Sequence, residues 1–204
     1  MKKTFILLFS LLSLTASAQY ISPFFATMPN DLLPYLSQNN RKDLIDLYKS
    51  GKTPKVENLL KETTQLKALK EDFISLQLSE SSSAELKLLP ISDTTKIIAL
   101  IKTVCGKACD SRIAFYTTSW KSINSSTILP TVSVSDFIKN PTNEDLLRAM
   151  DVPFFVYSFD AENQQLTVSL DAKNWLNKAD FDKFSPDLRS SIVLKWSNGK
   201  FVKE

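Results

Sequence analysis

Histidine is absent from all 204 residues of this chain. Its absence excludes Ser-His-Asp and Cys-His triads, the commonest zinc sites and haem ligation by histidine. Glycine is nearly as scarce, since only Gly51, Gly106 and Gly199 occur, each of them isolated. Loops that cradle phosphates need clustered glycines so that backbone N–H groups can approach the ligand. We therefore exclude P-loop and Rossmann nucleotide sites, and we expect no metal, no cofactor and no catalytic constellation.

An excess of charge of either sign is also missing. The chain has 25 Lys and Arg against 22 Asp and Glu, a net charge of +3, which falls to +1 if Lys2 and Lys3 are removed with a leader. No basic cluster stands out, and affinity for nucleic acid rests mainly on neutralising phosphates. We therefore do not expect a nucleic-acid partner. The remaining composition, 43% hydrophobic and 23% charged, is that of an ordinary globular protein.

The first 18 residues have the pattern of a secretory signal peptide. Lys2 and Lys3 precede an apolar run over Phe5–Leu14, and the small residues Ala16-Ser17-Ala18 follow. The run is well short of the roughly 20 residues that a stable membrane span needs. No cysteine lies near the cut and no later segment is apolar enough to cross a membrane, so we expect neither a lipid anchor nor a membrane span. We predict cleavage after Ala18 and release into a periplasmic or extracellular space.

The first third of the mature chain is predicted to be helical. Asn30 is expected to cap a short helix to Leu36, which Pro34 limits to one or two turns. A second helix is expected from Asn40, with Asn40 and Asp43 at capping-box spacing and Gly51 just beyond its end.

From about Asp72 the hydrophobic period changes to two, which predicts strands. Residues 74–78 and 84–88 alternate apolar and polar side chains and predict a hairpin with one solvent-exposed face. Lys96–Val104 is apolar on both faces, so we expect it in the centre of a sheet. Another strand is predicted over Asp110–Trp120, followed by a Ser/Thr-rich linker over Ser119–Val134.

The remaining chain repeats the order of helices followed by strands. Thr142 and Asp145 form a capping box for a helix over Asn143–Met150. The predicted strands after it are Val152–Phe159, Gln164–Asp171, Ile192–Ser197 and Lys200–Lys203. Asn198-Gly199 favours a two-residue turn that pairs Trp196 with Phe201.

These elements together predict an α+β fold of N-terminal helices and antiparallel sheet meanders. We expect a single α+β domain over residues 19–204. A division into two lobes near residues 119–141, with two similar α+β halves, remains open, because no residue-level repeat proves a duplication.

Cys105 and Cys109 flank a short connection between two predicted strands. In an oxidising compartment such a close pair should form a disulfide that closes the hairpin. A redox-active site is the alternative, but the spacing differs from C-x-x-C and no helix N-terminus follows to lower a thiol pKa. We predict a structural bridge.

The strand Val152–Phe159 provides candidate binding residues. A four-residue loop after it would place Phe159 opposite Gln164, with the residues at 155, 157 and 159 facing the core. Phe154 and Val156 then lie on the opposite, largely polar face. They are either covered by another element or part of a small binding patch. The loop tryptophans Trp120 and Trp175 are candidates of the same kind.

Several acidic residues lie in predicted loops or at helix starts, where carboxylates cap helices and face solvent. They are Glu80, Asp136, Glu144, Asp145, Asp180 and Asp182. A glycoside hydrolase needs two carboxylates and no histidine, so this class stays open, although nothing in the sequence selects a pair.

A set of short strings spread along the chain resembles a known family. They are Met28–Leu36, Asn40–Asp46, Glu85–Pro90, Thr103–Cys105, Asp110-Ser111, Phe115-Tyr116 and Trp120. The mature chain resembles an uncharacterised family of exported bacterial proteins, domain of unknown function 3256. The resemblance implies export and a single shared architecture, and it implies no activity, ligand or site residue.

The sequence therefore leaves two function classes. One is a non-catalytic exported protein that binds an envelope or extracellular protein or glycan. The alternative is a carboxylate-dependent hydrolase that acts on envelope or extracellular glycans.

Overall fold

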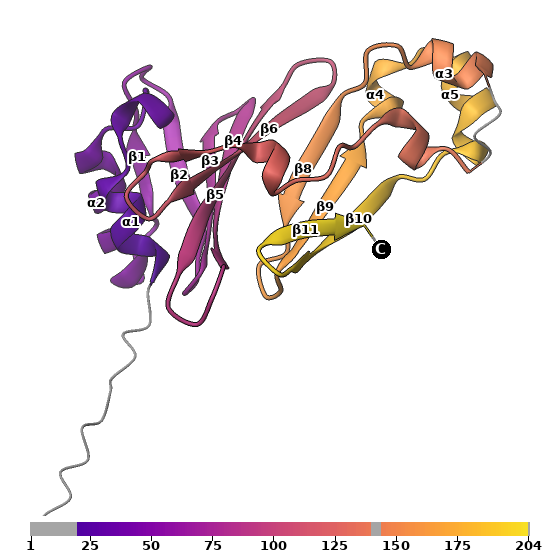
Figure 1. Cartoon of the computed structure of the whole chain (residues 1–204). Coiled ribbons are helices and arrows are strands. Elements are labelled where there is room, and N and C mark those ends of the chain that lie inside the picture. The colour runs from indigo at the N-terminus through magenta and orange to yellow at the C-terminus, as the bar shows by residue number, and fades with distance from the viewer. Residues whose placement is uncertain (1–19, 140–143, 204) are drawn as a thin grey trace, which may run out of the picture.

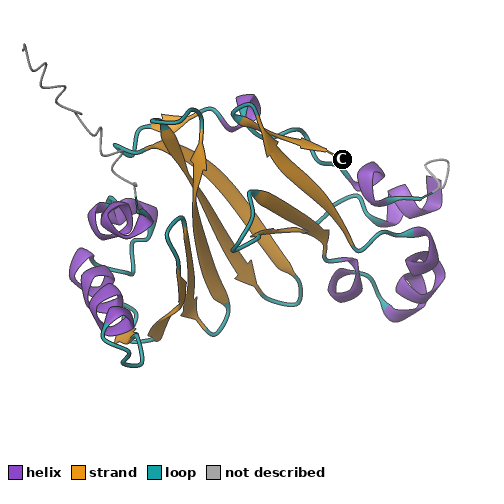
Figure 2. Ribbon diagram, turned by 90° about the horizontal axis from the view of Figure 1, so that it is seen from below, coloured by secondary structure: helices purple, strands orange, loops and turns teal. Residues whose placement is uncertain are grey.

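A computed structural model describes residues 20–139 and 144–203 of the chain. It has two antiparallel sheets with helices on the outside (Figures 1 and 2). The first sheet has seven strands in sequence order: β1 (Lys55–Glu57), β2 (Thr63–Leu69), β3 (Phe73–Ser79), β4 (Ser82–Pro90), β5 (Lys96–Cys105), β6 (Cys109–Thr117) and β7 (Ser122–Ile123). The second sheet has the order β11-β10-β9-β8, from β8 (Phe155–Phe159), β9 (Gln165–Leu170), β10 (Ser191–Ser197) and β11 (Lys200–Lys203). The predicted α+β class is confirmed.

Two N-terminal helices cover one face of the first sheet (Figure 1). They are α1 (Ile21–Thr27) and α2 (Gln38–Lys49), with the short 3-10 helix η1 (Asn30–Leu32) between them. Ile21 and Phe25, one helical turn apart on α1, pack with Leu44 of α2 against the apolar side chains of β3, β4 and β5. This cluster forms the first of two hydrophobic cores.

The helix boundaries correct the sequence prediction in two places. The capping box of α2 is formed by Ser37 and Asn40, because each side chain accepts a bond from the backbone N–H of the other. The helix therefore begins before Asn40. Asn30 does not cap a helix to Leu36; the 3-10 turn ends at Leu32, and the Asn30 side chain accepts a hydrogen bond from Arg41. Gly51 does take the expected left-handed conformation, with φ of 70°.

The prediction that the whole first third is helical was wrong for residues 55–69, which form β1 and β2. The register between β2 and β3 shifts between Leu66 and Ala68, which marks a β-bulge at Lys67. The bulge interrupts the alternation of buried and exposed residues, so the period of two is not visible in the sequence.

The second sheet packs on the other face of the first. Strand β8 contacts β4, β5 and β6, and one hydrophobic core contains side chains from both sheets. Lys96–Val104, expected in the centre of a sheet, is β5 and is paired on both sides. The solvent-exposed face predicted for the hairpin of residues 74–88 was wrong, because the β8–β9 hairpin covers it and Lys87 is 0% exposed.

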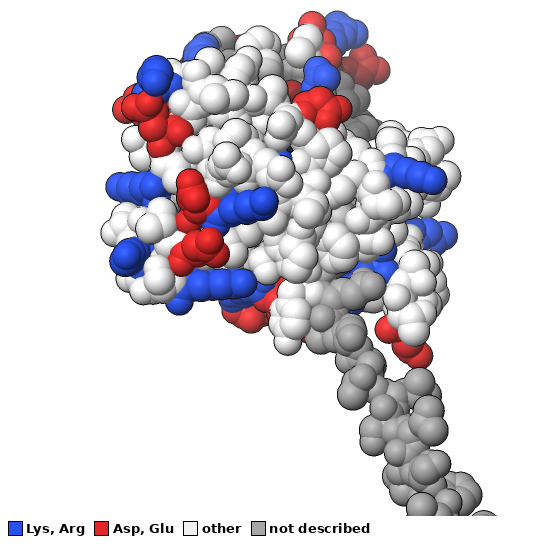
Figure 3. All heavy atoms as spheres, turned by 90° about the vertical axis from the view of Figure 1, so that its left-hand side faces the viewer, with Lys and Arg blue, Asp and Glu red and all other residues white. Residues whose placement is uncertain are grey.

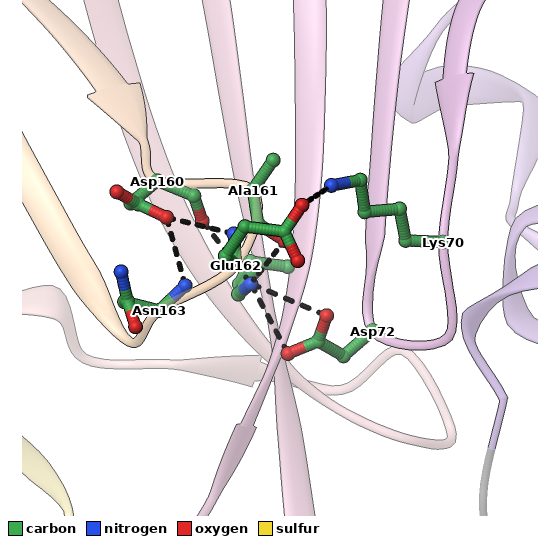
Figure 4. A network of polar contacts seen from close by, with 7 residues as sticks. Lys70, Asp72, Asp160, Ala161, Glu162 and Asn163 are labelled. Carbon is green, nitrogen blue, oxygen red and sulfur yellow. Dashed lines mark hydrogen bonds and ion pairs between the residues drawn. The ribbon is translucent and has the colours of Figure 1, made fainter.

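The buried charge of Lys87 is satisfied by a polar network between the sheets, and Figure 4 shows its partners. Its Nζ lies 3.1 Å from a carboxylate oxygen of Asp72 and donates to the backbone oxygens of Asp160 and Ala161. The Asp160 carboxylate in turn accepts from two backbone N–H groups of its own loop, and Lys70 pairs with Glu162. The network fastens the β8–β9 turn to the first sheet.

The register of β8 and β9 differs from the prediction by two residues. Phe159 pairs with Leu166, not with Gln164, because the loop between the strands is longer than four residues. A shift of two preserves the faces, so the residues at 155, 157 and 159 still point into the core, as predicted. The Asn198-Gly199 turn and the pair Trp196–Phe201 are confirmed.

The remaining helices gather at the far end of the second sheet (Figure 1). They are α3 (Glu144–Ala149), α4 (Ala172–Trp175) and α5 (Lys178–Phe184), with η4 (Ser185–Asp187) following α5. The segment between the sheets contains η2 (Ser125–Thr127) and η3 (Val134–Phe137). The predicted capping residue Thr142 and the signal peptide lie outside the described residues. Within residues 20–139 and 144–203, no helix has the length and hydrophobicity needed to cross a membrane.

Candidate functional site

An open pocket of about 670 Å³ lies at one end of the first sheet, on the side that carries the helices. Neither α1 nor α2 contributes to its lining, because these helices cover a different part of the sheet. The pocket is formed by the ends of β3 to β6, by residues 32–36 and by the loop between β1 and β2.

The floor of the pocket consists of two rows of side chains across β4, β5 and β6. In one row Lys102 pairs with Ala84 on one side and with Arg112 on the other. In the next row Val104 pairs with Ser82 and with Asp110. Directly paired residues of antiparallel strands point to the same face. Because Ala84 belongs to the core beneath the helices, both rows face the helix side.

The first wall, residues 32–36, is held in place by Arg41 of α2. This side chain is 0% exposed, and its guanidinium donates to the backbone oxygens of Met28 and Leu36 and to Oδ1 of Asn30. Burial lowers the pKa of Arg41 from its ordinary value. The contacts reach from residue 28 to residue 36, so Arg41 attaches this wall to α2 at both ends.

The second wall, the loop at residues 58–62, is organised by buried Asn58. Its Nδ2 donates to Thr64 Oγ1 and to the backbone oxygen of Leu78, and its Oδ1 accepts from the N–H groups of Leu60 and Glu62. Both N–H donors and both oxygen lone pairs of the amide are thus engaged. The two walls are joined by a 2.9 Å hydrogen bond from Leu59 N to the backbone oxygen of Tyr35.

Large hydrophobic side chains are exposed around the pocket. Tyr35 is 53% exposed, Leu60 51% and Val104 62%, and all three line it. The neighbouring Leu59 is 64% exposed. On the helix-bearing side of the molecule, Lys, Arg, Asp and Glu leave an uncharged area near the middle of the view (Figure 3). Exposed hydrophobic side chains that cluster around one cavity mark an interaction site more often than a structural feature.

Four charged side chains line the same pocket: Glu62, Lys102, Asp110 and Arg112. The Nζ of Lys102 donates to the backbone oxygen of Leu32 at 3.3 Å. Arg112 has no side-chain partner among the residues that the structure describes. In the same described part of the chain, neither cation forms an ion pair with either carboxylate.

The candidates proposed from the sequence lie elsewhere. Phe154 contacts Trp175 of α4, with ring centroids 4.6 Å apart, so two of the four candidates are in contact with each other. Val156 lies half-buried on β8 beside Ser169. Trp120 packs on Tyr116, and its indole Nε1 is buried without a hydrogen-bond partner among the described residues. None of the four lines the pocket.

Four of the six acidic residues singled out in the sequence form ion pairs or help to cap a helix. Asp136 pairs with Lys203, Glu144 with Arg148 and Asp145 with Lys183, while Asp180 takes part in the cap of α5. Among residues 20–139 and 144–203, no group of three or more His, Cys, Asp or Glu side chains is placed to hold a metal ion. The cysteine prediction is confirmed, since Cys105 and Cys109 form a disulfide at the end of the β5–β6 hairpin, beside the pocket floor.

Sequence reasoning missed the pocket residues, although two signals were present. Lys102 interrupts a strand that is otherwise largely apolar on both faces. Leu59 and Leu60 form an apolar pair in an otherwise polar loop. Each signal points to a face that is not covered by the core, but neither one identifies the elements that meet there.

Two antiparallel sheets with a helix layer and an open apolar pocket define this chain as an α+β protein with a preformed cavity at one sheet end. The chain belongs to the family described as "Protein of unknown function (DUF3256)", whose model matches residues 13–201. A solved structure, that of a domain of an uncharacterized protein from Porphyromonas gingivalis W83, has the same fold, with a TM-score of 0.80 and 24% sequence identity. The match covers 90% of this chain and 98% of that one. No curated protein matches the chain.

Proposed function

We propose that this protein is an exported, non-catalytic binding protein that holds an apolar molecule in the pocket between residues 32–36, the β1–β2 loop and the ends of β3–β6. The observation that carries this proposal is the concentration of exposed hydrophobic side chains at one preformed cavity. Of the nine large hydrophobic residues that are exposed in the described part of the chain, three line this pocket, Tyr35, Leu60 and Val104, and Leu59 is the chain neighbour of Leu60.

The physical reason is the cost of leaving apolar surface in water, about 25 cal/mol per Å². Isolated exposed hydrophobics are common, but a cluster around a concave surface is removed from water only when a ligand fills it. The volume of about 670 Å³ is in the range of small-molecule sites, and the walls are held by buried Arg41 and Asn58 before any ligand binds. Such a pocket has little ordering entropy to lose on binding.

A fluorescence titration with the uncharged probe N-phenyl-1-naphthylamine tests the proposal. We expect saturable binding to the wild type, and about tenfold weaker binding to the double variant Leu60→Gln/Val104→Thr, because these changes make two exposed lining side chains polar. The matched control Leu147→Gln/Val152→Thr makes the same two changes at exposed hydrophobics outside the pocket. Its binding should equal that of the wild type. Absence of saturable binding, or equal loss in both variants, would overturn the proposal.

A carboxylate-dependent hydrolase is the second candidate, because Glu62 and Asp110 both line the pocket. Hydrolysis of a glycan would require these two carboxyl groups to flank a sugar ring. A glycan hydrolysis screen on the wild type and on Glu62→Gln/Asp110→Asn separates the classes. Turnover that disappears in this variant would replace the binding proposal, whereas no turnover together with probe binding supports it.

The predicted contact residues Phe154, Val156, Trp120 and Trp175 stay a prediction about a macromolecular partner. A pull-down of the mature domain from its own envelope extract, compared with Phe154→Ala and Trp120→Ala, tests it. A partner retained by both variants would rule out Phe154 and Trp120 as contacts.

A further inference from the structure

We infer that the pocket selects a small amphiphile with an apolar body and one anionic group, and that Lys102 and Arg112 bind the anion. This inference rests on the proposed function and specifies the ligand class of the same site. The apolar body would contact Leu60 and Val104, and the anionic group would lie over the Lys102–Arg112 row.

The first argument is the position of the two cations. Lys102 and Arg112 are directly opposite each other on β5 and β6 and point to the same face. Their Cβ atoms are therefore separated by only about 5 Å. Like charges at such a pair of positions destabilise a sheet, unless an anion is shared between them. The arrangement costs stability in the empty protein and is relieved by a bound anion.

The second argument is the unused hydrogen-bonding capacity. Arg112 has five N–H donors and no side-chain partner among the described residues, and Lys102 makes a single bond of 3.3 Å. A carboxylate can accept two parallel bonds from a guanidinium and a third from the ammonium group. The two cations are thus able to bind one anion together.

The third argument concerns the competing carboxylates. Asp110 belongs to the next row, opposite Val104, and Glu62 belongs to the loop on the other side. Neither forms an ion pair with Lys102 or Arg112, and so neither carboxylate occupies the N–H donors of the two cations. The opposite outcome is that the two carboxylates select a cationic amphiphile, and the experiment tests it with decylamine.

The test is displacement of N-phenyl-1-naphthylamine by three ligands that share a ten-carbon chain: decanoate, decanol and decylamine. All are used at pH 7.4, decanoate and decylamine below their micelle concentrations and decanol below its solubility limit. We expect decanoate to bind the wild type about fivefold to tenfold more tightly than decanol, which is the range for two partly solvated ion pairs. Decylamine should bind most weakly.

The decisive variant is Lys102→Met/Arg112→Met, which removes the charges and keeps the apolar stems. We expect it still to bind the uncharged probe and to lose the preference for decanoate, measured as the ratio of decanoate affinity to decanol affinity within that variant. The control Lys67→Met/Arg189→Met removes the same charge at exposed positions outside the pocket and should keep the preference. Thermal unfolding of both variants verifies that each one is folded.

The outcomes separate this inference from the proposed function. If the probe binds but decanoate and decanol bind equally, or if the pocket variant keeps its preference for decanoate, the anion inference is wrong and the binding proposal stands. If decylamine binds best, the carboxylates select the ligand and the inference is overturned. If the probe does not bind at all, the proposed function itself fails.

Discussion

At the scale of single residues, Arg41 connects the stability of the fold with the shape of the pocket. Its guanidinium is buried between α2 and the segment at residues 28–36, where it donates to two backbone oxygens and to Asn30. Without the guanidinium these buried carbonyl groups would have no donor, and an unsatisfied buried polar group costs about 1–3 kcal/mol. The pocket wall would also lose its attachment to the helix layer.

We predict that Arg41→Met lowers the free energy of unfolding by about 3 kcal/mol, because charged hydrogen bonds to the wall are lost together. Arg41→Lys should recover little of it, since one ammonium group cannot span acceptors as far apart as residues 28 and 36. Urea unfolding measures both effects. Arg189→Met, at an exposed position, is the control and should change the unfolding free energy by less than about 0.5 kcal/mol. If Arg41→Met changed the unfolding free energy as little as the control does, the wall would be held by other contacts.

Glu85 is a second residue with a measurable consequence. It lies between the sheets and accepts hydrogen bonds from Phe159 N and Ser158 Oγ. Burial raises the pKa of Glu85, against the opposing effect of these two bonds. The folded state therefore binds the Glu85 proton more tightly than the unfolded state does, and stability is lost as pH rises from the unfolded pKa through the folded one.

We predict that Glu85→Gln removes this loss. The unfolding free energy of the variant relative to the wild type should increase as pH rises above the unfolded pKa of glutamate, and level off above the raised, folded pKa. Urea unfolding at a series of pH values gives the difference curve. A curve that is flat, or that falls as pH rises, would contradict the raised pKa.

At the scale of elements, the β5–β6 hairpin forms the pocket floor and ends in the Cys105–Cys109 disulfide. The closed loop is short, so the chain-entropy account gives less than the about 3 kcal/mol of a 15-residue loop. The nine-residue pairing of the two strands holds the hairpin in register independently of the bridge. The disulfide therefore has a modest role in stability.

We predict that Cys105→Ser/Cys109→Ser lowers the unfolding free energy by about 1–2 kcal/mol and leaves the fold intact. Reductant should shift the urea midpoint of the wild type in the same direction and have no effect on the double variant. Alkylation of the denatured, non-reduced protein should label neither cysteine. Two labelled thiols in exported protein would reject the bridge.

At the scale of the whole molecule, a helix layer, the first sheet and the second sheet are stacked, and the core between the sheets contains residues from both (Figure 2). Export of this assembly stays a prediction, because residues 1–19 lie outside the described part of the chain. The disulfide is consistent with an oxidising compartment.

We predict that the exported protein begins at Gln19. The physical reason is the charged start, the short apolar run and the small residues that end at Ala18. Intact-mass measurement of the protein recovered outside the cytoplasm checks the cleavage position. A product that still begins at Met1 would contradict it.

The sequence by itself determined the features that depend on neighbouring residues. The Asn198-Gly199 turn, the apolar faces of β3, β4 and β8 and the disulfide all follow from local period, turn chemistry or close spacing. The faces of β8 and β9 were right even with the register two residues off, because the side-chain period is two.

Only the tertiary structure decided which polar residues are buried and where the pocket lies. Lys87 was predicted to face solvent, and it is buried because a hairpin more than 70 residues further along the chain packs over it. Lys102 and Leu60 come from elements far apart in sequence, and they meet because the first sheet extends beyond its helix layer. Contacts between elements that are distant in sequence depend on the assembled fold, and local sequence patterns do not predict them.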